Sequence, residues 1–339
     1  MTAAATPPAP TFERGACRAD AARLFAKPRG GGARALPAPN PGYNWLGGQT
    51  NNYGSVGIYG ALNVVDPASP HTSTDFLAHR IMVKSCDSSR WLEIGWAEVG
   101  WRANAQYIYS FNTVTNTWMF FDQYPIASGS RIWVALVHVG NNVWEAQLFW
   151  NGAWQTLVSV NPGSGIGCGN EQYVEPYKPT TNFNFPTITT GDGTSGGMKI
   201  ARPSDAAWLT WNTSIPTLEN NASSDGYYNT TWNTKYYAWQ VRSNQPPVAS
   251  LYVSPTTGQA STTSFYADLW GSYDPEGSGL SYRISWGDGS TTYAASGTHT
   301  YSSAGTKTIT GTVTDNWGQS RSTTRTVRVC TLLVASTCV

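Results

Sequence analysis

The sequence has few charged residues and lacks several patterns that mark common enzyme classes. Only 12% of its 339 residues are Asp, Glu, Lys or Arg, and the formal net charge is +1. No electrostatic footprint for nucleic acid or an anionic membrane is therefore visible. The four His residues show no metal spacing, and no nucleophile motif surrounds any Ser. A serine hydrolase or a zinc hydrolase is unsupported, and we expect no cofactor.

Long apolar runs are also missing. No run approaches the length of a membrane span, and the N-terminus lacks the continuous apolar core of a signal peptide. What the chain has instead is 13% aromatic residues, with 16 Trp and 18 Tyr, and many Gly, Pro, Ser, Thr and Asn residues between short β-prone runs. This composition is typical of an extracellular all-β protein.

Cysteine is scarce, and its number is odd. The five Cys residues are widely spaced and show no zinc spacing. Cys330 and Cys338 could close a terminal loop, and Cys86 with Cys168 could staple the larger domain. Cys17 would then be left over. Such pairs would suit an oxidising compartment, so we expect a secreted protein.

Composition shifts divide the chain into four parts. Residues 1–42 are rich in Ala, Pro and Gly and are expected to be a disordered leader or propeptide, or an unprocessed start, with one short helix over Ala16 to Lys27. Residues 43–243 are expected to form one large antiparallel β-sandwich, and residues 244–329 a small one. Residues 330–339 are a C-terminal tail. Consecutive prolines in Asn244 to Val248 predict a stiff linker at the boundary.

Short strands recur through residues 43–243 with turn residues between them, and helical periodicity is absent. Asn151-Gly152 is a type I′ hairpin signal, and Asn141-Asn142 is a weaker one. The main expected strands are Gly57 to Val65, Phe76 to Val83, Trp91 to Trp101, Gln106 to Phe111, Trp118 to Asp122, Arg131 to Val139, Val143 to Trp150, Ala153 to Val160 and Tyr236 to Arg242.

Two stretches with acidic residues, Arg90 to Trp101 and Asn170 to Pro176, are candidates for a functional groove. Side chains alternate between the two faces of a strand, so Trp91 and Glu93 share one face, and Glu171, Tyr173 and Glu175 share one face of a second strand. Two strands that carry carboxylates could supply an acid/base pair. The alternative is that each carboxylate simply faces solvent on an antiparallel sheet.

Two further features carry open alternatives. Glu145 is a third possible groove carboxylate or, alternatively, a solvent-facing strand residue. Between residues 208 and 239 aromatic side chains crowd together. This crowd could be a platform for sugars or peptides, but more often such a crowd covers a large sheet.

Short motifs in residues 43–190 resemble the eqolisin-type glutamic peptidases and their relatives, the neprosins. Asn44-Trp45-Leu46-Gly47 is similar to the opening eqolisin segment. Leu92-Glu93-Ile94-Gly95 is similar to the eqolisin strand with the catalytic Gln, which is Glu here, as in neprosins. Asn170 to Glu175 resembles the strand with the catalytic Glu, although Gln172 replaces its Trp. Tyr107 to Phe111 lacks the Glu of another eqolisin tract.

The resemblance implies a concanavalin-like sandwich and a secreted endopeptidase that acts at acidic pH on polypeptides. Glu93 and Glu171 would be catalytic. One carboxylate would keep a proton and polarise the scissile carbonyl, and the ionised one would activate water. Glu93 could stand in for the Gln donor only while protonated. The expected substrate-binding residues are Trp45, Trp91, Tyr173, Glu175 and Glu145.

Two other classes fit the same residues. A non-catalytic adhesin or glycan-binding module would use the aromatic groove to hold an extracellular glycan or protein surface. A glycoside hydrolase would need two carboxylates at a set separation across a cleft.

Residues 248–329 resemble a PKD domain, an immunoglobulin-like sandwich. The matching motifs include Ser272 to Gly277, Ile284 to Ser290, His299 to Ile309 and Val313 to Gly318. Trp286-Gly-Asp-Gly289 suits a tight turn in which Gly supplies positive φ. Asp274 and Glu276 could ligate calcium or, alternatively, cap their own turn.

Overall fold

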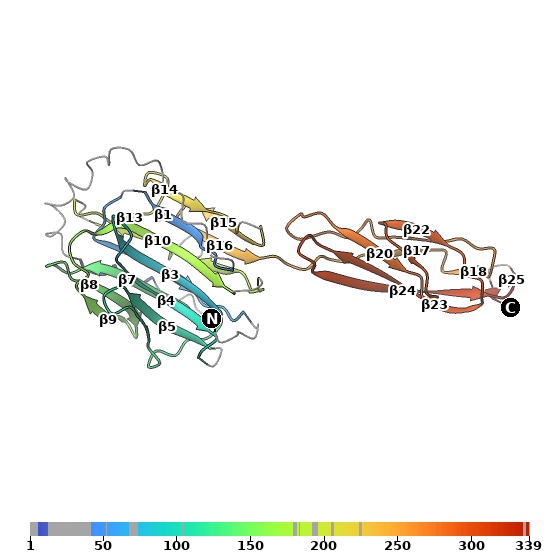
Figure 1. Cartoon of the computed structure of the whole chain (residues 1–339), viewed down its shortest axis with the longest axis horizontal. Helices are drawn as coiled ribbons and strands as arrows, with labels where there is room; N and C mark the ends of the chain where they lie inside the picture. The colour runs from blue at the N-terminus through green and yellow to red at the C-terminus, as the bar shows by residue number, and fades with distance from the viewer. Residues whose placement is uncertain are drawn as a thin grey trace. The chain divides into compact units, whose positions relative to one another are not determined.

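The computed structural model describes residues 6–12, 42–51, 53–67, 74–102, 105–178, 182, 184–191, 196–204, 207–223, 226–334 and 337–338. The chain divides into two compact units, Met1–Ser243 and Asn244–Val339. Within the described residues every regular element is a strand, which confirms the all-β fold class (Figure 1). The helix expected over Ala16 to Lys27 and most of the expected leader lie outside the described residues.

The first unit contains a seven-stranded antiparallel sheet, whose order from β14 to β5 can be followed in Figure 1. In spatial order its strands are β14 (Thr217–Asn220), β1 (Leu46–Thr50), β10 (Ile166–Tyr177), β3 (Phe76–Ser85), β4 (Trp91–Val99), β5 (Gln106–Asn112) and β6 (Thr117–Phe120).

A nine-stranded sheet packs against the first to complete the sandwich. Its main path is β15 (Tyr228–Thr234), β16 (Ala238–Ser243), β11 (Ile188–Thr190), β2 (Gly57–Asn63), β7 (Arg131–His138), β8 (Trp144–Trp150) and β9 (Ala153–Val160), and β12 (Lys199–Ala201) and β13 (Leu209–Thr210) complete it.

Turn chemistry agrees with the sequence in the β8–β9 hairpin. Asn151 and Gly152 have φ values of 50° and 88°, and both are positive as a type I′ turn requires. Asn141 and Asn142, before β8, also have positive φ values, 53° and 60°. The strands expected from alternation are all present, with ends that shift by no more than two residues except at the start of β10, which begins at Ile166 rather than Asn170.

The core lies between the two sheets and includes a few buried polar contacts. Trp239 Nε1 in β16 donates to Gln172 Oε1 in β10 at 2.5 Å. His79 Nε2 in β3 and Thr190 Oγ1 in β11 are 2.8 Å apart. Burial lowers the pKa of His79 to about 3, so this side chain is neutral and structural. These pairs fix the facing registers of the two sheets, because an unpaired polar group would be costly there.

Both predicted disulfides are present, Cys86–Cys168 and Cys330–Cys338. Cys86 directly follows β3, and Cys168 lies in β10 at a register shift between Ile166 and Gly169. The first disulfide therefore joins two adjacent strands at one end of the seven-stranded sheet.

The second unit is a smaller sandwich with its own core around Phe265, Trp286 and Tyr301. Its three-stranded sheet is β17 (Tyr252–Ser254), β19 (Phe265–Asp268) and β22 (Ser296–His299). Its five-stranded sheet is β18 (Thr257–Gln259), β24 (Ser320–Cys330), β23 (Gly305–Thr314), β20 (Ser281–Ser285) and β21 (Thr291–Thr292), and a short hairpin joins β25 (Leu333–Val334) and β26 (Thr337–Cys338).

Asn244 behaves differently from the expected linker. Its side chain donates to Asp315 Oδ2 at 2.7 Å, and its carbonyl oxygen accepts from Gln319 Nε2 at 3.1 Å. Asn244 therefore belongs to the second unit, because its polar groups are held by that unit's own turn. As to membranes, the described residues include no helix long and apolar enough to cross one.

Candidate functional site

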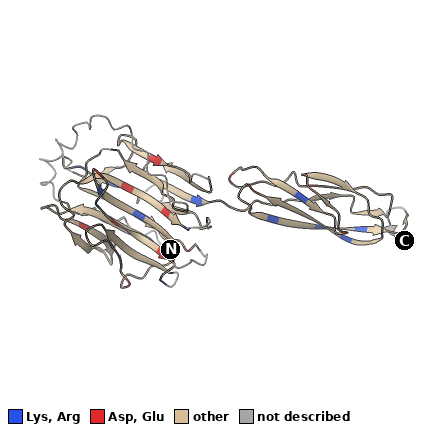
Figure 2. Ribbon diagram, in the orientation of Figure 1, with Lys and Arg blue, Asp and Glu red and all other residues tan. Residues whose placement is uncertain are grey.

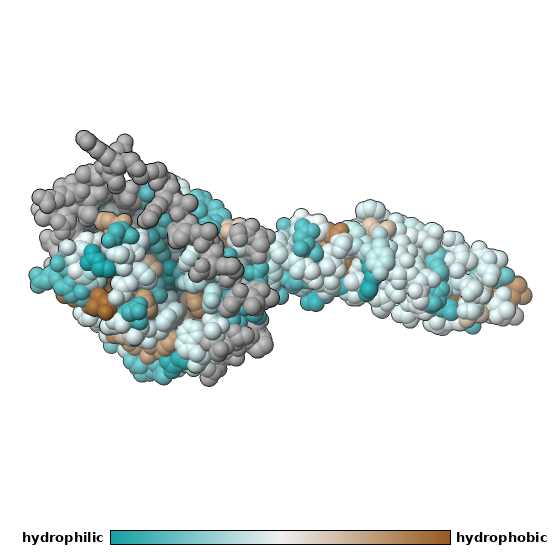
Figure 3. Space-filling view, in the orientation of Figure 1, coloured by the Kyte–Doolittle hydropathy of each residue, from teal (hydrophilic) through white to brown (hydrophobic). Residues whose placement is uncertain are grey.

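A cavity of about 530 Å³ lies on the outer face of the seven-stranded sheet. Figure 3 shows this face hollowed, and Figure 2 shows acidic and basic residues side by side on the central strands. We call this cavity the groove. It is lined by Tyr43, Trp45, Phe76, Arg80, Met82, Lys84, Ser88, Trp91, Glu93, Phe111, Trp118, Glu171, Tyr173 and Glu175.

Strand register brings the charged residues together. β3 lies between β4 and β10, and Met82 of β3 is opposite Glu93 on one side and Glu171 on the other. Neighbouring strands are about 4.8 Å apart, so the two glutamates start roughly 10 Å apart at their Cα atoms. Their side chains rise on the same outer face. The alternation predicted from sequence for both acidic strands is therefore correct.

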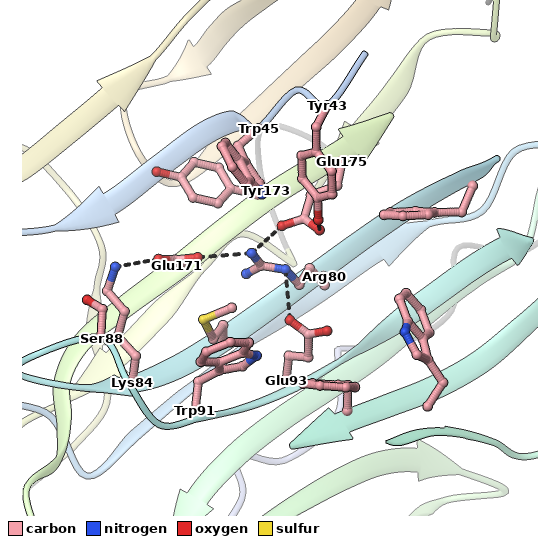
Figure 4. Close-up of a pocket in the computed structure, with 14 residues that line it drawn as sticks. Tyr43, Trp45, Arg80, Lys84, Ser88, Trp91, Glu93, Glu171, Tyr173 and Glu175 are labelled. Atoms are coloured by element: carbon pink, nitrogen blue, oxygen red, sulfur yellow. Dashed lines mark hydrogen bonds and ion pairs between the residues drawn. The ribbon is translucent and has the colours of Figure 1, made fainter. Parts of the chain in front are cut away.

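Arg80 is the centre of the groove (Figure 4). Its Nε lies 3.1 Å from Glu93 Oε2, and its Nη2 lies 3.0 Å from Glu171 Oε2. The same Nη2 also pairs with Glu175 Oε1. Only 3% of the Arg80 side chain is exposed. One guanidinium thus holds three carboxylates from two strands, which a point-charge ammonium could not do as well.

Gly95 helps to make room at this level of the sheet. It stands directly opposite Arg80 across the β3–β4 pair. A Cβ at Gly95 would collide with the carbonyl oxygen of His79, so β3 and β4 approach closely here only because residue 95 is Gly.

A second cation and a tyrosine complete the charged floor. Lys84 Nζ pairs with Glu171 Oε1 and donates to Gln49 Oε1 at 2.8 Å. Tyr43 donates its hydroxyl to Glu175 Oε2 at 3.0 Å. The floor therefore contains two cations and three carboxylates. Since buried charges are stable only when balanced, one proton on a carboxylate makes this set neutral.

The pKa shifts indicate where that proton resides. Burial raises the pKa of Glu93 to about 8; Arg80 opposes the shift, and Glu175 and Glu171 add to it. Burial would also raise the pKa of Glu171, but Arg80 and Lys84 outweigh it and hold that pKa below its usual value. Burial raises the pKa of Glu175 as well. The lowered pKa leaves Glu171 ionised at neutral pH, and the raised pKa values favour a proton on Glu93 or Glu175. Opposed shifts in one groove are the pattern that separates an acid from a base.

Aromatic rings form the walls. Trp45 lies against Tyr43 with ring centroids 4.5 Å apart, and Trp91 stacks on Phe111 at 5.9 Å. The Arg80 guanidinium carbon is 5.6 Å from the Tyr173 ring centroid. Such walls suit an extended chain with apolar side chains or a flat sugar ring.

Most residues expected at the site line the groove, and one does not. Trp45, Trp91, Glu93, Glu171, Tyr173 and Glu175 all do. The expectation that Glu145 joins them is wrong: Glu145 is on β8 in the nine-stranded sheet, where its carboxylate accepts from Gln147 and Thr156. Strand alternation can assign a face within one strand, but it cannot assign the strand to a sheet.

Sequence reasoning missed Arg80 and Lys84. Both lie on one face of β3 with Met82, in the run Phe76 to Ser85, so alternation could have placed them together. Their importance depends on β3 lying between the two acidic strands, and the sequence does not reveal that order.

Buried polar atoms without hydrogen-bond partners also occur in the described part of the second unit. Asp274 Oδ1 accepts from the backbone N–H groups of Glu276 and Ser278, so this carboxylate caps its own turn. Asp274 Oδ2, Glu276 Oε1 and Asn244 Oδ1 are buried and have no hydrogen-bond partner among the described residues. Oxygen donors from two carboxylates and an amide are of the type that calcium prefers. Across the described chain no group of three or more His, Cys, Asp or Glu residues could hold a metal ion.

Comparisons with known proteins divide along the two units. The PKD domain family matches residues 244–330. The PKD1 domain of Vibrio anguillarum Epp is 32% identical, with a TM-score of 0.22. The match covers 25% of this chain and 95% of the Epp domain. Scytalido-glutamic peptidase, solved with a transition state analog inhibitor, is 14% identical, covering 59% of this chain and 98% of its own, with a TM-score of 0.45.

A structure of carbohydrate-binding modules from the β-sandwich superfamily is 28% identical, with a TM-score of 0.25. The match covers 26% of this chain and 36% of that structure's chain. No curated protein matches the chain. Fold and site thus define an all-β protein with an aromatic-walled, charged groove in its first unit. Residues 244–330 belong to the PKD domain family.

Proposed function

We propose that the first unit is a glutamic-type endopeptidase and that the protein acts outside the cell. The observation that carries the proposal is that Glu93 and Glu171, from separate strands, both pair with Arg80 on the floor of one aromatic-walled groove. Two disulfides and a PKD domain are in keeping with an extracellular location.

In this proposal Glu171 is the base and Glu93 the acid. Glu171 is ionised even in mildly acidic solution, because its pKa is lowered, and it takes a proton from the water that attacks the scissile carbonyl. Glu93 is protonated below about pH 8 and donates a hydrogen bond to the carbonyl oxygen, as a Gln amide would. The new C–O bond forms as the carbonyl π electrons move onto that oxygen. When these electrons return, the C–N bond breaks, and the leaving amine takes the proton that Glu171 removed from the water.

Arg80 has a supporting role. Its Nη1 and Nε are buried and have no hydrogen-bond partner among the described residues. Nε nevertheless lies 3.1 Å from Glu93 Oε2, and Nη2 pairs with Glu171 and Glu175. Nη1 is therefore an available donor at the groove floor for a substrate carbonyl. The aromatic walls would hold the peptide on either side of the cleaved bond.

The second candidate is a non-catalytic binding module for a glycan or protein surface. The observation that favours it is that each of the three carboxylates already has an ion pair with Arg80. A fully paired floor would position a ligand without reacting with it.

A panel of variants at a fixed pH near 6 tests the proposal. We expect the full chain to cleave an unfolded protein, Glu171→Gln to abolish cleavage, and Glu93→Gln to retain part of it because an amide can still donate. Glu145→Gln is the matched control, since Glu145 faces away from the groove on the other sheet. Cleavage that survives in Glu171→Gln would overturn the assignment. A wild-type chain that binds peptide or glycan but never cleaves peptide would instead support the second candidate function, the non-catalytic binding module.

A further inference from the structure

A proline-rich segment of the chain lies on the outer face of the nine-stranded sheet. Residues 6–12 read Thr-Pro-Pro-Ala-Pro-Thr-Phe and have no helix or strand. Pro7 and Pro10 are buried, whereas Pro8, Ala9 and Thr11 are exposed. A polyproline II helix has three residues per turn, so a spacing of three places the two buried prolines on one face. The burial pattern is that of a polyproline II segment docked along one side.

The surface under this segment is aromatic. Tyr59, Trp133, Phe149, Trp154 and Trp208 form one cluster on β2, β7, β8, β9 and the loop before β13, and we call it the outer aromatic surface. Trp208 meets Tyr59 edge-on at 4.7 Å, and Phe12 meets Trp208 edge-on at 5.2 Å. The segment's last residue therefore extends the cluster.

Two indole N–H groups fix the segment by its backbone. Trp154 Nε1 donates to the carbonyl oxygen of Pro8 at 2.8 Å, and Trp208 Nε1 donates to that of Pro10 at 2.9 Å. Proline has no backbone N–H, so its carbonyl is the polar group it can offer. Indole donors beside flat aromatic rings are the chemistry by which aromatic-lined grooves hold polyproline II peptides.

The sheet has space reserved for this arrangement. A Cβ at Gly57 would collide with the ring of Trp208, so Trp208 can approach β2 this closely only because residue 57 is Gly. Trp154 and Trp208 are 54 residues apart in the sequence, yet both indole N–H groups donate hydrogen bonds to the same short segment. This convergence favours a recognition site over a chance contact.

We propose that the outer aromatic surface is a binding site for proline-rich polypeptide in the polyproline II form, and that its ligand in this chain is Thr6 to Phe12. The segment stays bound without a covalent link when the chain is cut between residues 13 and 41. While intact, this connection of 29 residues holds the ligand at an effective concentration on the order of millimolar. Cutting makes the site exchangeable. The site is on the other sheet from the groove, so it does not depend on the proposed peptidase activity.

The test uses the full chain with a specific protease site in place of Gly30 to Gly32. After cutting, size exclusion with mass spectrometry reports whether the N-terminal fragment remains with the rest. Equilibrium dialysis then follows a labelled peptide of residues 6–12. We expect the fragment to be retained, the peptide to bind the cut chain at least tenfold more tightly than the uncut chain, and a matched peptide with all three prolines changed to Ala not to compete.

Variants of the surface give the second readout. Trp154→Phe and Trp208→Phe keep a ring but lose the donor, and each is expected to weaken peptide binding roughly two- to tenfold. Gly57→Ala should weaken it by displacing Trp208. Trp150→Phe is the control, because Trp150 packs on Tyr124 instead. Complete loss of the fragment on cutting, equal binding of the Ala peptide, or unchanged binding in both Trp variants would overturn the proposal.

Discussion

Glu93 and Glu171 share one guanidinium, yet burial and charge shift their pKa values in opposite directions. Arg80 is the largest charge that lowers both pKa values, but Glu171 also pairs with Lys84 and accepts hydrogen bonds from both cations. These contacts outweigh the burial of Glu171, whereas for Glu93 burial outweighs Arg80 and the pKa stays raised. Lys84 on β3 therefore contributes to the difference between the two pKa values.

This asymmetry predicts how stability changes with pH. The folded-state pKa of Glu93 is about 8, above its ordinary value of 4.5. The contribution of Glu93 is therefore fully present below about pH 4.5 and is lost as the pH rises through 8. We expect the free energy of unfolding to fall over this range by an amount on the order of a few kcal/mol. In Glu93→Gln, the free energy of unfolding should not show this decrease with pH.

Denaturant unfolding at several pH values from 5 to 9 measures the effect. Glu145→Gln is the control and should keep the wild-type slope. Identical slopes in wild type and Glu93→Gln would mean that Glu93 does not hold a proton in the folded state.

Arg80 is expected to be the most costly single residue to remove from the groove. Arg80→Met leaves three buried carboxylates without their shared cation, and removing one partner of a buried ion pair typically costs about 3 to 5 kcal/mol. The cost should shrink near pH 4, where the carboxylates can take up protons.

Arg102→Met is the matched control. Arg102 pairs with Asp122 at 2.8 Å, but their side chains are 30% and 65% exposed. An exposed pair contributes about 1 kcal/mol or less. Unfolding free energies that drop equally in both variants would contradict the central place given to Arg80.

At the scale of elements, the sequence predicts which side chains share a face of a strand, but it does not predict the order of the strands in a sheet. The faces of Trp91 to Trp101 and of Asn170 to Pro176 follow from a period of two, and the structure agrees. Arg80 and Glu145 show the limit. Arg80 matters because β3 pairs with both acidic strands, and Glu145 is misplaced because β8 belongs to the other sheet. Both facts are set by contacts distant in sequence.

The turn after Tyr273 gives a prediction for the second unit. Asp274 Oδ2, Glu276 Oε1 and Asn244 Oδ1 offer buried oxygens without hydrogen-bond partners among the described residues. Calcium bound at these oxygens would raise the unfolding temperature, because a ligand that binds only the folded state stabilises it.

Calorimetry with added calcium and with a chelator measures the shift. Asp274→Asn should abolish it. Asp288→Asn should not, because Asp288 pairs with His299 in a separate turn. An unfolding temperature unchanged by calcium would leave Asp274 and Glu276 with only their turn-capping role.

At the scale of the whole molecule, each unit has its own core and its own disulfide. Cys86 and Cys168 are 82 residues apart in sequence. Closing a loop of that length restricts the unfolded chain, and we expect the Cys86→Ser, Cys168→Ser double variant to lose about 4 kcal/mol of unfolding free energy.

The Cys330→Ser, Cys338→Ser double variant is the comparison, because its loop spans only 8 residues and its loss should be smaller. Unfolding under identical oxidising conditions measures both. Equal losses would contradict the loop-length argument.

The most direct test of the central claim is the pH dependence of peptide hydrolysis by the full chain between pH 3 and pH 9. If Glu171 is the base and Glu93 the acid, the rate rises as Glu171 ionises, below pH 4.5, and falls as Glu93 loses its proton near pH 8. In Glu93→Gln the fall near pH 8 should disappear, and a chelator should change nothing. No hydrolysis at any pH in this range, or a fall near pH 8 that persists in Glu93→Gln, would contradict the account.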